Sequence, residues 1–374
     1  MRYGPGGVVT RFCLDAFDSS NQGHLAAAVD LWNAASGADL AITLAGVRFN
    51  TRPSTGAQQA GRLAVIDGQP AGFVLATEFS EGDPRVSAPE KGWIDAIAVA
   101  PVHQGRGIGT ALMDWAEGWL AGRGCTRFQL GGSLRPFAPG LPSALATAEF
   151  FRRRGYAPRA HGPVVWDVAR DLRTYRTPPF VPVTLSAQVR PARAGDDGAL
   201  LAFLEREFGG RWFYEAREFL AGGGRISDFV VLLTPAGVDG FCWLTLEDSA
   251  RSLDRCFMAR LPRPWGHLGP IGISAAMRGG GYGAAVLDAG LRRLRDAGIA
   301  GCVIDWTDLL DFYGKFGFAT YRSYEMLAKD AVEQERRLLQ VDLLLSCAQM
   351  KRRGEQGGQV SRSSASCPNP EIGI

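Results

Sequence analysis

The sequence has 374 residues, 46% of them hydrophobic and 21% charged, with a formal net charge of +3. This length exceeds what one hydrophobic core usually supports and predicts two domains, while the small, scattered charge argues against a nucleic-acid partner. No apolar run is long enough to span a membrane, and no apolar leader follows the N-terminus. The seven cysteines form no C-x-x-C pair, so we expect reduced thiols in a cytoplasmic protein and no disulfide or metal site.

The first half of the chain alternates strand-like and helix-like segments. Leu25, Ala28 and Leu31 stand at helical spacing, and the turn signal Asp-Gly-Gln-Pro at 67–70 separates two apolar runs as in a hairpin. We expect strands at 8–14, 62–66, 71–77, 93–99, 126–130 and 163–168, and helices at 24–35, 108–121 and 143–154.

The second half repeats this order after a proline-rich stretch at 173–182, which predicts an extended linker. We expect strands at 188–191, 229–233, 240–246, 269–273, 301–306 and 320–326, and helices at 196–208, about 282–296 and 309–316. Such an internal duplication predicts the fold class α+β (mixed α/β), with two tandem domains that each hold a mixed, mostly antiparallel sheet flanked by helices.

The predicted domains are residues 1–172 and 187–328, joined by a linker at 173–186. Apolar positions such as Leu338, Leu339 and Leu343 predict an extra helix over 329–350, which packs within the chain or on a partner subunit. The Gly-, Ser- and Arg-rich remainder, 351–374, predicts a disordered tail.

Two segments align without a gap. Residues 97–109 read Ile-Ala-Val-Ala-Pro-Val-His-Gln-Gly-Arg-Gly-Ile-Gly, and residues 271–283 read Ile-Gly-Ile-Ser-Ala-Ala-Met-Arg-Gly-Gly-Gly-Tyr-Gly. Each is an apolar strand and a short connector, then a glycine-rich turn that opens an amphipathic helix. Because a helix N-terminus leaves unpaired N–H groups and glycines let an anion approach the backbone, each segment predicts a pyrophosphate-binding site.

Other interpretations of a glycine-rich turn fit less well. Tight packing alone could explain one such turn. A Rossmann fingerprint needs G-x-G-x-x-G near the chain start and an acid about 20 residues later, and a Walker loop needs Gly-Lys-Ser/Thr; the sequence has neither.

The first segment, from Val99 through Gln104 to Gly109, closely resembles the acetyl-coenzyme A signature of the GNAT (Gcn5-related N-acetyltransferase) superfamily. A later signature of that family, an aromatic pair before x-x-x-Gly-aromatic, also occurs twice, at 150–156 and 312–318. The resemblance covers about residues 8–170 and 187–328 and implies acetyl-CoA as the cofactor, with no metal. It implies these cofactor contacts in the two copies: Ile97, Val99, Gln104, Gly105, Arg106, Gly107, Ile108, Gly109 and Thr110, and Ile271, Ile273, Arg278, Gly279, Gly280, Gly281, Tyr282, Gly283 and Ala284.

The resemblance also suggests catalytic residues, but neither copy has the full set. The family's usual acid is a Tyr four residues before the Gly of the later signature, a place held by Tyr313 in the second copy and by Phe151 in the first. The usual base is an acid four residues before the last residue of the strand, a place held by Asp95 in the first copy and by Gly269 in the second. Asp305, at the end of an apolar strand, is a further candidate base or amine anchor. A core aromatic is the alternative for Tyr313, and a helix N-cap the alternative for Asp305. We expect the C-terminal copy to be the catalyst.

The resemblance implies an acetyl-CoA-dependent N-acetyltransferase that moves an acetyl group to a primary amine of a small molecule by direct attack in a ternary complex. Tandem members include mycothiol synthase-like and glucosamine/glucosaminide N-acetyltransferase-like proteins, and Asp-Trp-Thr at 305–307 favours the second group and an amino sugar. Trp265, His267 and Trp306 are the candidate substrate contacts, with core packing as the alternative. A non-catalytic acetyl-CoA sensor or a peptide or protein N-acetyltransferase are alternative functions. We expect no nucleic-acid or membrane partner and a monomer or homodimer.

Overall fold

The computed structural model describes residues 11–186 and 188–331. Residues up to Lys329 belong to one compact unit, and a second unit begins at Asp330. The predicted tail and nearly all of the predicted helix at 329–350 lie outside the described residues.

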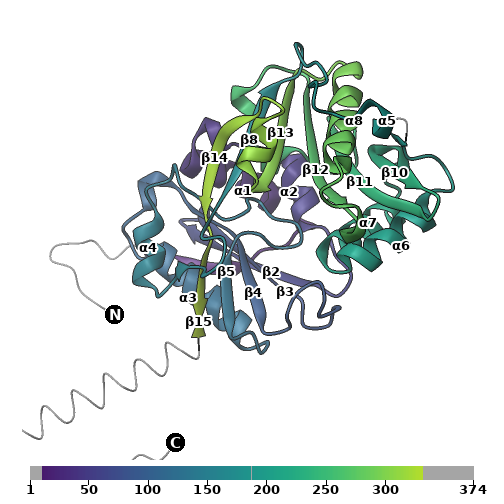
Figure 1. The fold of residues 1–374 in the computed structure, drawn as a ribbon. Coiled ribbons are helices and arrows are strands. Elements are labelled where there is room, and N and C mark those ends of the chain that lie inside the picture. Colours follow the sequence, from purple (N-terminus) through teal and green to yellow (C-terminus); the bar gives the residue numbers. More distant parts are fainter. Residues whose placement is uncertain (1–10, 187, 332–374) are drawn as a thin grey trace, which may run out of the picture. The chain divides into compact units, whose positions relative to one another are not determined.

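The first sheet has seven strands in the order β1-β2-β3-β4-β5-β15-β7 (Figure 1). The pairs β1–β2, β2–β3, β3–β4 and β7–β15 are antiparallel, and β4 pairs with β5 in parallel. The strands are β1 (Cys13–Ala16), β2 (Gln58–Ile66), β3 (Gln69–Glu78), β4 (Lys91–Val99), β5 (Arg127–Leu130), β7 (Ala157–Pro158) and β15 (Leu327–Asp330). The helices of this half are α1 (Gln22–Ser36), α2 (Leu44–Thr51), α3 (Ile108–Ala121) and α4 (Ala148–Arg153).

The second sheet has eight strands in the order β6-β14-β8-β13-β12-β11-β10-β9, with β12 and β13 as its parallel pair. The strands are β6 (Leu141–Pro142), β8 (Val164–Asp171), β9 (Val189–Pro191), β10 (Phe229–Thr234), β11 (Gly237–Leu246), β12 (Trp265–Ile273), β13 (Gly301–Thr307) and β14 (Ala319–Glu325). The helices are α5 (Val183–Ser186), α6 (Asp197–Phe208), α7 (Arg211–Ala221), α8 (Tyr282–Asp296) and α9 (Leu310–Gly314). Short 3₁₀ turns lie at Ala38–Leu40, Pro101–His103, Ile226–Asp228, Asp254–Cys256, Met258–Arg260 and Ala275–Met277.

Each sheet includes strands from the other half of the chain: β15 joins the first sheet, and β6 and β8 join the second. Strand β8, which ends the first half, lies between β13 and β14 in the second sheet, and β15 lies between β5 and β7 in the first. The strand expected at 163–168 therefore exists but belongs to the other sheet. This exchange ties the two halves together through backbone hydrogen bonds as well as side-chain packing.

The fold class predicted from the sequence is confirmed: two mixed, mostly antiparallel sheets flanked by helices. The helices at 24–35 and 108–121 and the hairpins also form as predicted. Helices α2 and α7 were not predicted, and the helix expected at 143–154 shortens to α4 because residues 143–147 form turns instead. The first two residues of the predicted extra helix, 329 and 330, belong to β15, and the helix itself stays a prediction. Among the described helices, none is both long and apolar enough to cross a bilayer.

Candidate active site

The two glycine turns have nearly the same backbone. Gly107 caps α3 with φ 84° and ψ −6°, and Gly281 caps α8 with φ 84° and ψ −4°. This left-handed conformation favours glycine, which explains the shared motif. In neither helix does a side chain cap the first turn, so backbone N–H groups at both starts are left for another acceptor.

The surroundings of the first turn are open. A Cβ added to Gly105 or Gly107 would meet no atom within 4 Å. The Gln104 amide donates to the Val99 carbonyl at 3.1 Å, which holds the connector against the end of β4. The side chain that the motif places before the glycines therefore fixes the turn, while the turn itself stays accessible.

A cavity of about 600 Å³ extends from this turn into the sheet. Strands β4 and β5 pair only as far as Ile94 and Leu130, and the cavity opens where they part. Of the expected cofactor contacts, the following line it: Ile97, Val99, Gln104, Gly105, Gly107, Gly109 and Thr110. Ile108 instead points into the core, and Arg106 is exposed. A long, mostly apolar cavity that ends at a helix N-terminus suits a pantetheine arm with a diphosphate.

Asp95 lies at the inner end of this cavity, one residue beyond the last β4–β5 pair. Its Oδ2 accepts hydrogen bonds from Gln59 at 2.9 Å and Thr77 at 2.5 Å. Its Oδ1 is buried and has no hydrogen-bond partner within 3.5 Å among the described residues, while the Ser133 hydroxyl lies near enough to lower the pKa of the carboxyl group. Burial raises the pKa of Asp95 to about 6, against the lowering effect of its hydrogen bonds. A buried carboxylate with one unpaired oxygen, on a residue that lines the cavity, is suited to take a proton from an amine that reaches it.

The side chains that hold Asp95 connect it to a second opening. Gln59 and Thr77 both line a cavity of about 330 Å³ on the β2–β3 side. Phe151, which stands where the family's acid would be, lines the larger cavity and offers no proton. The first copy therefore combines a cofactor-sized cavity with a base but no side-chain acid at the family's position.

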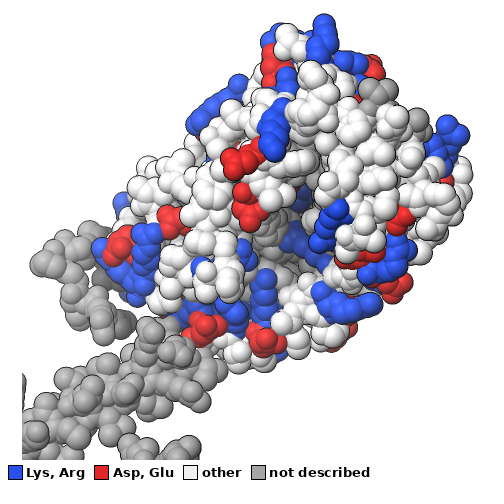
Figure 2. Space-filling view, in the orientation of Figure 1, with Lys and Arg blue, Asp and Glu red and all other residues white. Residues whose placement is uncertain are grey.

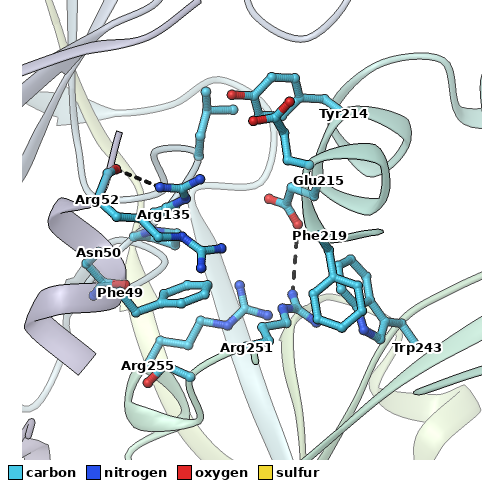
Figure 3. Close-up of a pocket in the computed structure, with 14 residues that line it drawn as sticks. Phe49, Asn50, Arg52, Arg135, Tyr214, Glu215, Phe219, Trp243, Arg251 and Arg255 are labelled. Carbon is cyan, nitrogen blue, oxygen red and sulfur yellow. Dashed lines mark hydrogen bonds and ion pairs between the residues drawn. The ribbon is translucent and has the colours of Figure 1, made fainter. Parts of the chain in front are cut away.

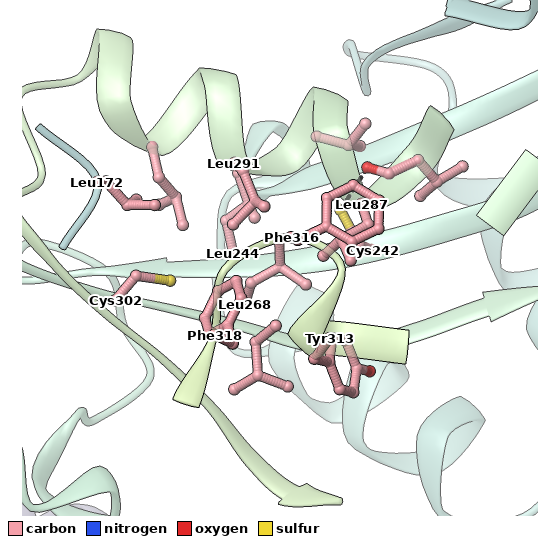
Figure 4. Packing of buried hydrophobic residues seen from close by; sticks show 14 of the residues in the cluster. Leu172, Cys242, Leu244, Leu268, Leu287, Leu291, Cys302, Tyr313, Phe316 and Phe318 are labelled. Carbon is pink, nitrogen blue, oxygen red and sulfur yellow. Dashed lines mark hydrogen bonds between the residues drawn. The ribbon is translucent and has the colours of Figure 1, made fainter. Parts of the chain in front are cut away.

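The second turn is covered on one side. A Cβ added to Gly281 would lie 3.0 Å from Pro182 Cγ and 3.7 Å from Leu185 Cδ1, both in the segment between the halves. One hydrophobic cluster joins α8, through Leu287 and Leu291, to the α9 region (Figure 4).

The cluster includes Tyr313 of α9 and, just after that helix, Phe316 and Phe318. Phe312 and Tyr282 pack against it. The corresponding aromatic pair of the first copy, Phe150 and Phe151, lines the open cavity instead. Aromatic packing is therefore denser around this pair in the second copy, although Tyr313 also lines a cavity there.

Asp305 is already ion-paired. Its Oδ2 lies 3.1 Å from an Arg255 nitrogen, and its Oδ1 lies 2.7 Å from His267 Nε2. Burial opposes ionisation of Asp305, but the Arg255 charge and His267 outweigh it and hold the pKa of Asp305 far below its usual range. Burial lowers the pKa of His267 to about 4, so the imidazole is neutral near pH 7 and donates to Asp305. A carboxylate so stabilised is a weak base but a firm anchor for a hydroxyl or ammonium group.

The His267–Asp305 pair lies where a side chain at position 269, the family's usual position for the base, would project. A Cβ added to Gly269 would lie 3.2 Å from His267 Nε2 and 3.6 Å from Asp305 Oδ1. The Cys256 thiol lies with them, since the candidate ligand atoms of the three residues are within 4.8 Å of one another. Burial raises the pKa of Cys256, so the thiol stays protonated. The Arg255 cation, which pairs with Asp305, is also close by. This is chemistry that disfavours a metal ion.

A central cavity of about 540 Å³ lies between residues of the two halves. Asp305, Trp306, Ile271 and the nearly buried Tyr313 line it from the second half. From the first half it is lined by Val86, Lys91, Trp93, Gln129, Gly132, Leu134 and Arg159. Figure 2 shows a hollow in this face of the molecule where Lys and Arg side chains gather. Burial and the nearby Arg211 lower the pKa of Lys91 to about 8.

Of the three predicted substrate contacts, Trp306 lines the central cavity and the other two do not. Trp306 lines the central cavity and reaches the first half, because a Cβ added to Gly132 would lie 3.0 Å from its ring. His267 is buried behind Asp305, and the Trp265 indole donates to the Leu261 carbonyl at 3.1 Å. Sequence reasoning missed the cationic lining of the cavity, including Lys91, which stands in no motif.

Comparisons with known proteins show which proteins this chain is similar to. Residues 44–135 match the acetyltransferase (GNAT) family. The mycothiol acetyltransferase of Nocardia farcinica is 30% identical over 283 residues, which cover 69% of this chain and 78% of that protein. The mycothiol acetyltransferase of Salinispora arenicola is 32% identical over 249 residues, which cover 61% and 70%.

Two solved structures share the fold. The glucosamine N-acetyltransferase region of a fungal multi-domain GH3 β-N-acetylglucosaminidase has a TM-score of 0.72 at 22% identity, over 85% of this chain and 38% of that longer chain. A tandem GNAT protein from the clavulanic acid biosynthesis pathway has a TM-score of 0.59 at 14% identity, over 86% and 99%.

Proposed function

Because the chain belongs to the GNAT acetyltransferase family, we propose that it transfers the acetyl group of acetyl-CoA to a primary amine of a small molecule, with the cofactor bound in the first copy. The observation that carries this proposal is the cavity of about 600 Å³ between the open turn at Gly107 and the unpartnered Oδ1 of Asp95. Acetyl-CoA supplies the activated acetyl thioester. The backbone N–H groups at the start of α3 bind its diphosphate, and the edge of β4 at Ile97–Val99 binds its pantetheine arm.

Asp95 acts as the general base in this proposal. Above pH 6 its carboxylate is ionised, and Oδ1 accepts the proton that the amine loses as it attacks. Gln59 and Thr77 hold the other oxygen, so the carboxylate keeps one orientation. Phe151 lines the cavity wall and donates no proton, so the departing thiolate takes its proton from solvent.

The amine acceptor is an amino sugar in this proposal. The central cavity offers aromatic faces in Trp93 and Trp306 and carboxylates in Asp305 and Asp308, groups that stack on a sugar ring and bind its hydroxyls. The name of the fungal structural relative, a glucosamine N-acetyltransferase region, agrees with this class.

The prediction that the C-terminal copy is the catalyst stays untested. Tyr313 lines the central cavity, as an acid must, and Asp305 stands near the place of a base. Against it, Pro182 and Leu185 cover the turn at Gly281, and Asp305 is already paired.

The proposal is tested by thiol release from acetyl-CoA with amino sugars, amino acids, polyamines and peptide N-termini as acceptors. We expect release with amino sugars and one acetyl-CoA bound per chain by calorimetry. Tight cofactor binding with no thiol release for any amine would contradict an enzyme and favour a sensor.

A further inference from the structure

Four arginines surround a small cavity beside the central one, where residues of both halves meet. Arg52 and Arg135 come from the first half, and Arg251 and Arg255 come from the loop between β11 and β12. Figure 3 shows their guanidinium groups converging on one space, with Phe49 at its side. The cavity measures about 40 Å³, which is room for a small oxyanion and too little for a sugar ring.

Positive charge exceeds negative charge at this cavity. Glu215 and Glu218 are the carboxylates that line it, so the four arginines leave an excess of two positive charges. Glu215 is also shared, since Arg211 binds it at 2.5 Å while Arg251 lies 3.8 Å away. Adding Arg211 and the Asp305 that pairs with Arg255 leaves the same excess.

Protein groups use only part of the donor capacity of these arginines. One Arg135 nitrogen donates to the Arg52 and Pro53 carbonyls at 2.6 and 2.7 Å, and one Arg251 nitrogen donates to the Gly269 carbonyl at 2.7 Å. The Arg52 guanidinium stacks on Phe49 at 4.3 Å and makes no hydrogen bond with any described residue. Each guanidinium has five N–H donors, so several remain for a ligand.

The arginines also disfavour one another's charge. Burial and the nearby Arg52 together lower the pKa of Arg135 to about 10. Burial and the nearby Arg255 together lower the pKa of Arg251 to about 10. An anion in the cavity would relieve this repulsion and satisfy the free donors at once.

This cavity adjoins the proposed acceptor site. Leu134, Glu215, Arg251 and Arg255 line both cavities, so they form the wall between them. A ligand in the central cavity can therefore extend an anionic group to the arginines.

We propose that the arginine cavity binds the phosphate group of a phosphorylated amine acceptor, and so selects amino-sugar phosphates over neutral amino sugars. The excess of two positive charges matches a phosphate monoester, which carries about two negative charges at neutral pH. Planar guanidinium forks suit phosphate oxygens. This inference rests on the proposed function for the reaction, but the anion site itself does not depend on catalysis.

The first experiment measures inorganic phosphate binding to the full chain by calorimetry at low salt. We expect Arg52→Gln to weaken phosphate binding about tenfold, through the loss of charge-assisted hydrogen bonds, and Arg52→Lys to restore part of it. Arg48→Gln, one turn earlier on α2 and away from the cavities, is the matched control and should bind phosphate as the unaltered chain does. Saturating acetyl-CoA should leave the phosphate affinity unchanged, because the cofactor cavity is separate. Equal binding by Arg52→Gln and the control, or displacement of phosphate by acetyl-CoA, would overturn the site.

The second experiment compares glucosamine with its 6-phosphate as acceptors. We expect a higher kcat/KM for the phosphate, and a fall in that preference of about tenfold in Arg52→Gln that appears in KM. Phosphate binding that depends on Arg52 without transfer to any amine would sink the proposed function and leave the anion site standing. Transfer to amino sugars with no preference for the phosphate, or an Arg52-dependent preference for carboxylated amines, would overturn the phosphate assignment.

Discussion

The two glycine turns share a sequence pattern and a backbone conformation, but they differ in their surroundings. At Gly107 the turn faces open space and a deep cavity, whereas at Gly281 the linker residues Pro182 and Leu185 lie against it. Local sequence fixed the conformation of both turns, but distant chain segments decided their access. A motif therefore identifies what a segment can bind, and packing decides whether the ligand reaches it.

The two centres differ in electrostatics as well. Asp95 is buried with one free oxygen and a raised pKa, whereas Asp305 is buried with an arginine and a histidine and has a strongly lowered pKa. The first is poised to accept a proton, and the second is a fixed charge.

Removing the proposed base should have the largest effect. Asp95→Asn keeps the shape and the contacts with Gln59 and Thr77 but cannot take a proton, so kcat should fall about a thousandfold with little change in acetyl-CoA affinity. Steady-state kinetics and calorimetry measure the two quantities. A rate within threefold of the unaltered chain would remove Asp95 from the mechanism and return the second centre to consideration.

Breaking the ion pair of the second centre should destabilise the protein. Asp305→Asn leaves the Arg255 guanidinium buried without its counter-charge, so we expect a loss of roughly 3 kcal/mol in the free energy of unfolding. Denaturant titration measures it, and Asp308→Asn, at a more exposed carboxylate, is the comparison. Equal stability of the two variants would mean that Asp305 is no structural anchor.

The raised pKa of Asp95 predicts a pH-dependent stability difference. The folded state binds its proton more tightly than the unfolded state, so the contribution of Asp95 is most favourable below about pH 4 and is lost as pH rises to 6. Asp95→Asn should therefore be more stable than the unaltered chain at pH 8, by up to about 3 kcal/mol, and similar at pH 4. Thermal melts at the two pH values check this, and a stability gain that is the same at both would contradict the raised pKa.

Removing the hydroxyl of the second centre should have the smallest effect. Tyr313→Phe keeps the core packing with Phe318, and we expect turnover to change less than threefold if the first copy is the catalyst. The sequence alone favours the opposite result, a large loss of kcat. Such a loss in steady-state kinetics would make the second centre the catalyst.

The sequence predicted features that depend on local conformation. Both turns follow from glycines that must adopt positive φ, and α1 and α3 follow from apolar spacing. The exchange of β8 and β15 was not predictable, because a strand pattern does not specify which sheet the strand joins.

The sequence predicted one part of the candidate site, Asp95, and missed another, the arginine cavity. Asp95 came from its offset to the motif, and the structure supplies the free oxygen that gives it a role. The arginines Arg251 and Arg255 lie in an irregular loop without a motif, and only tertiary packing brings them to Arg52 and Arg135. Coverage of Gly281 by Pro182 depends on a contact across about a hundred residues of sequence, which no local pattern reports.

Calorimetry on one matched pair of variants shows whether the first turn, and not the second, binds acetyl-CoA. Gly109 and Gly283 are equivalent helical glycines without positive φ, so a phenylalanine at either strains the backbone little. Gly109→Phe fills the open cavity, and we expect it to abolish acetyl-CoA binding, while Gly283→Phe still binds one molecule per chain. Retained binding in Gly109→Phe together with loss in Gly283→Phe would contradict the account.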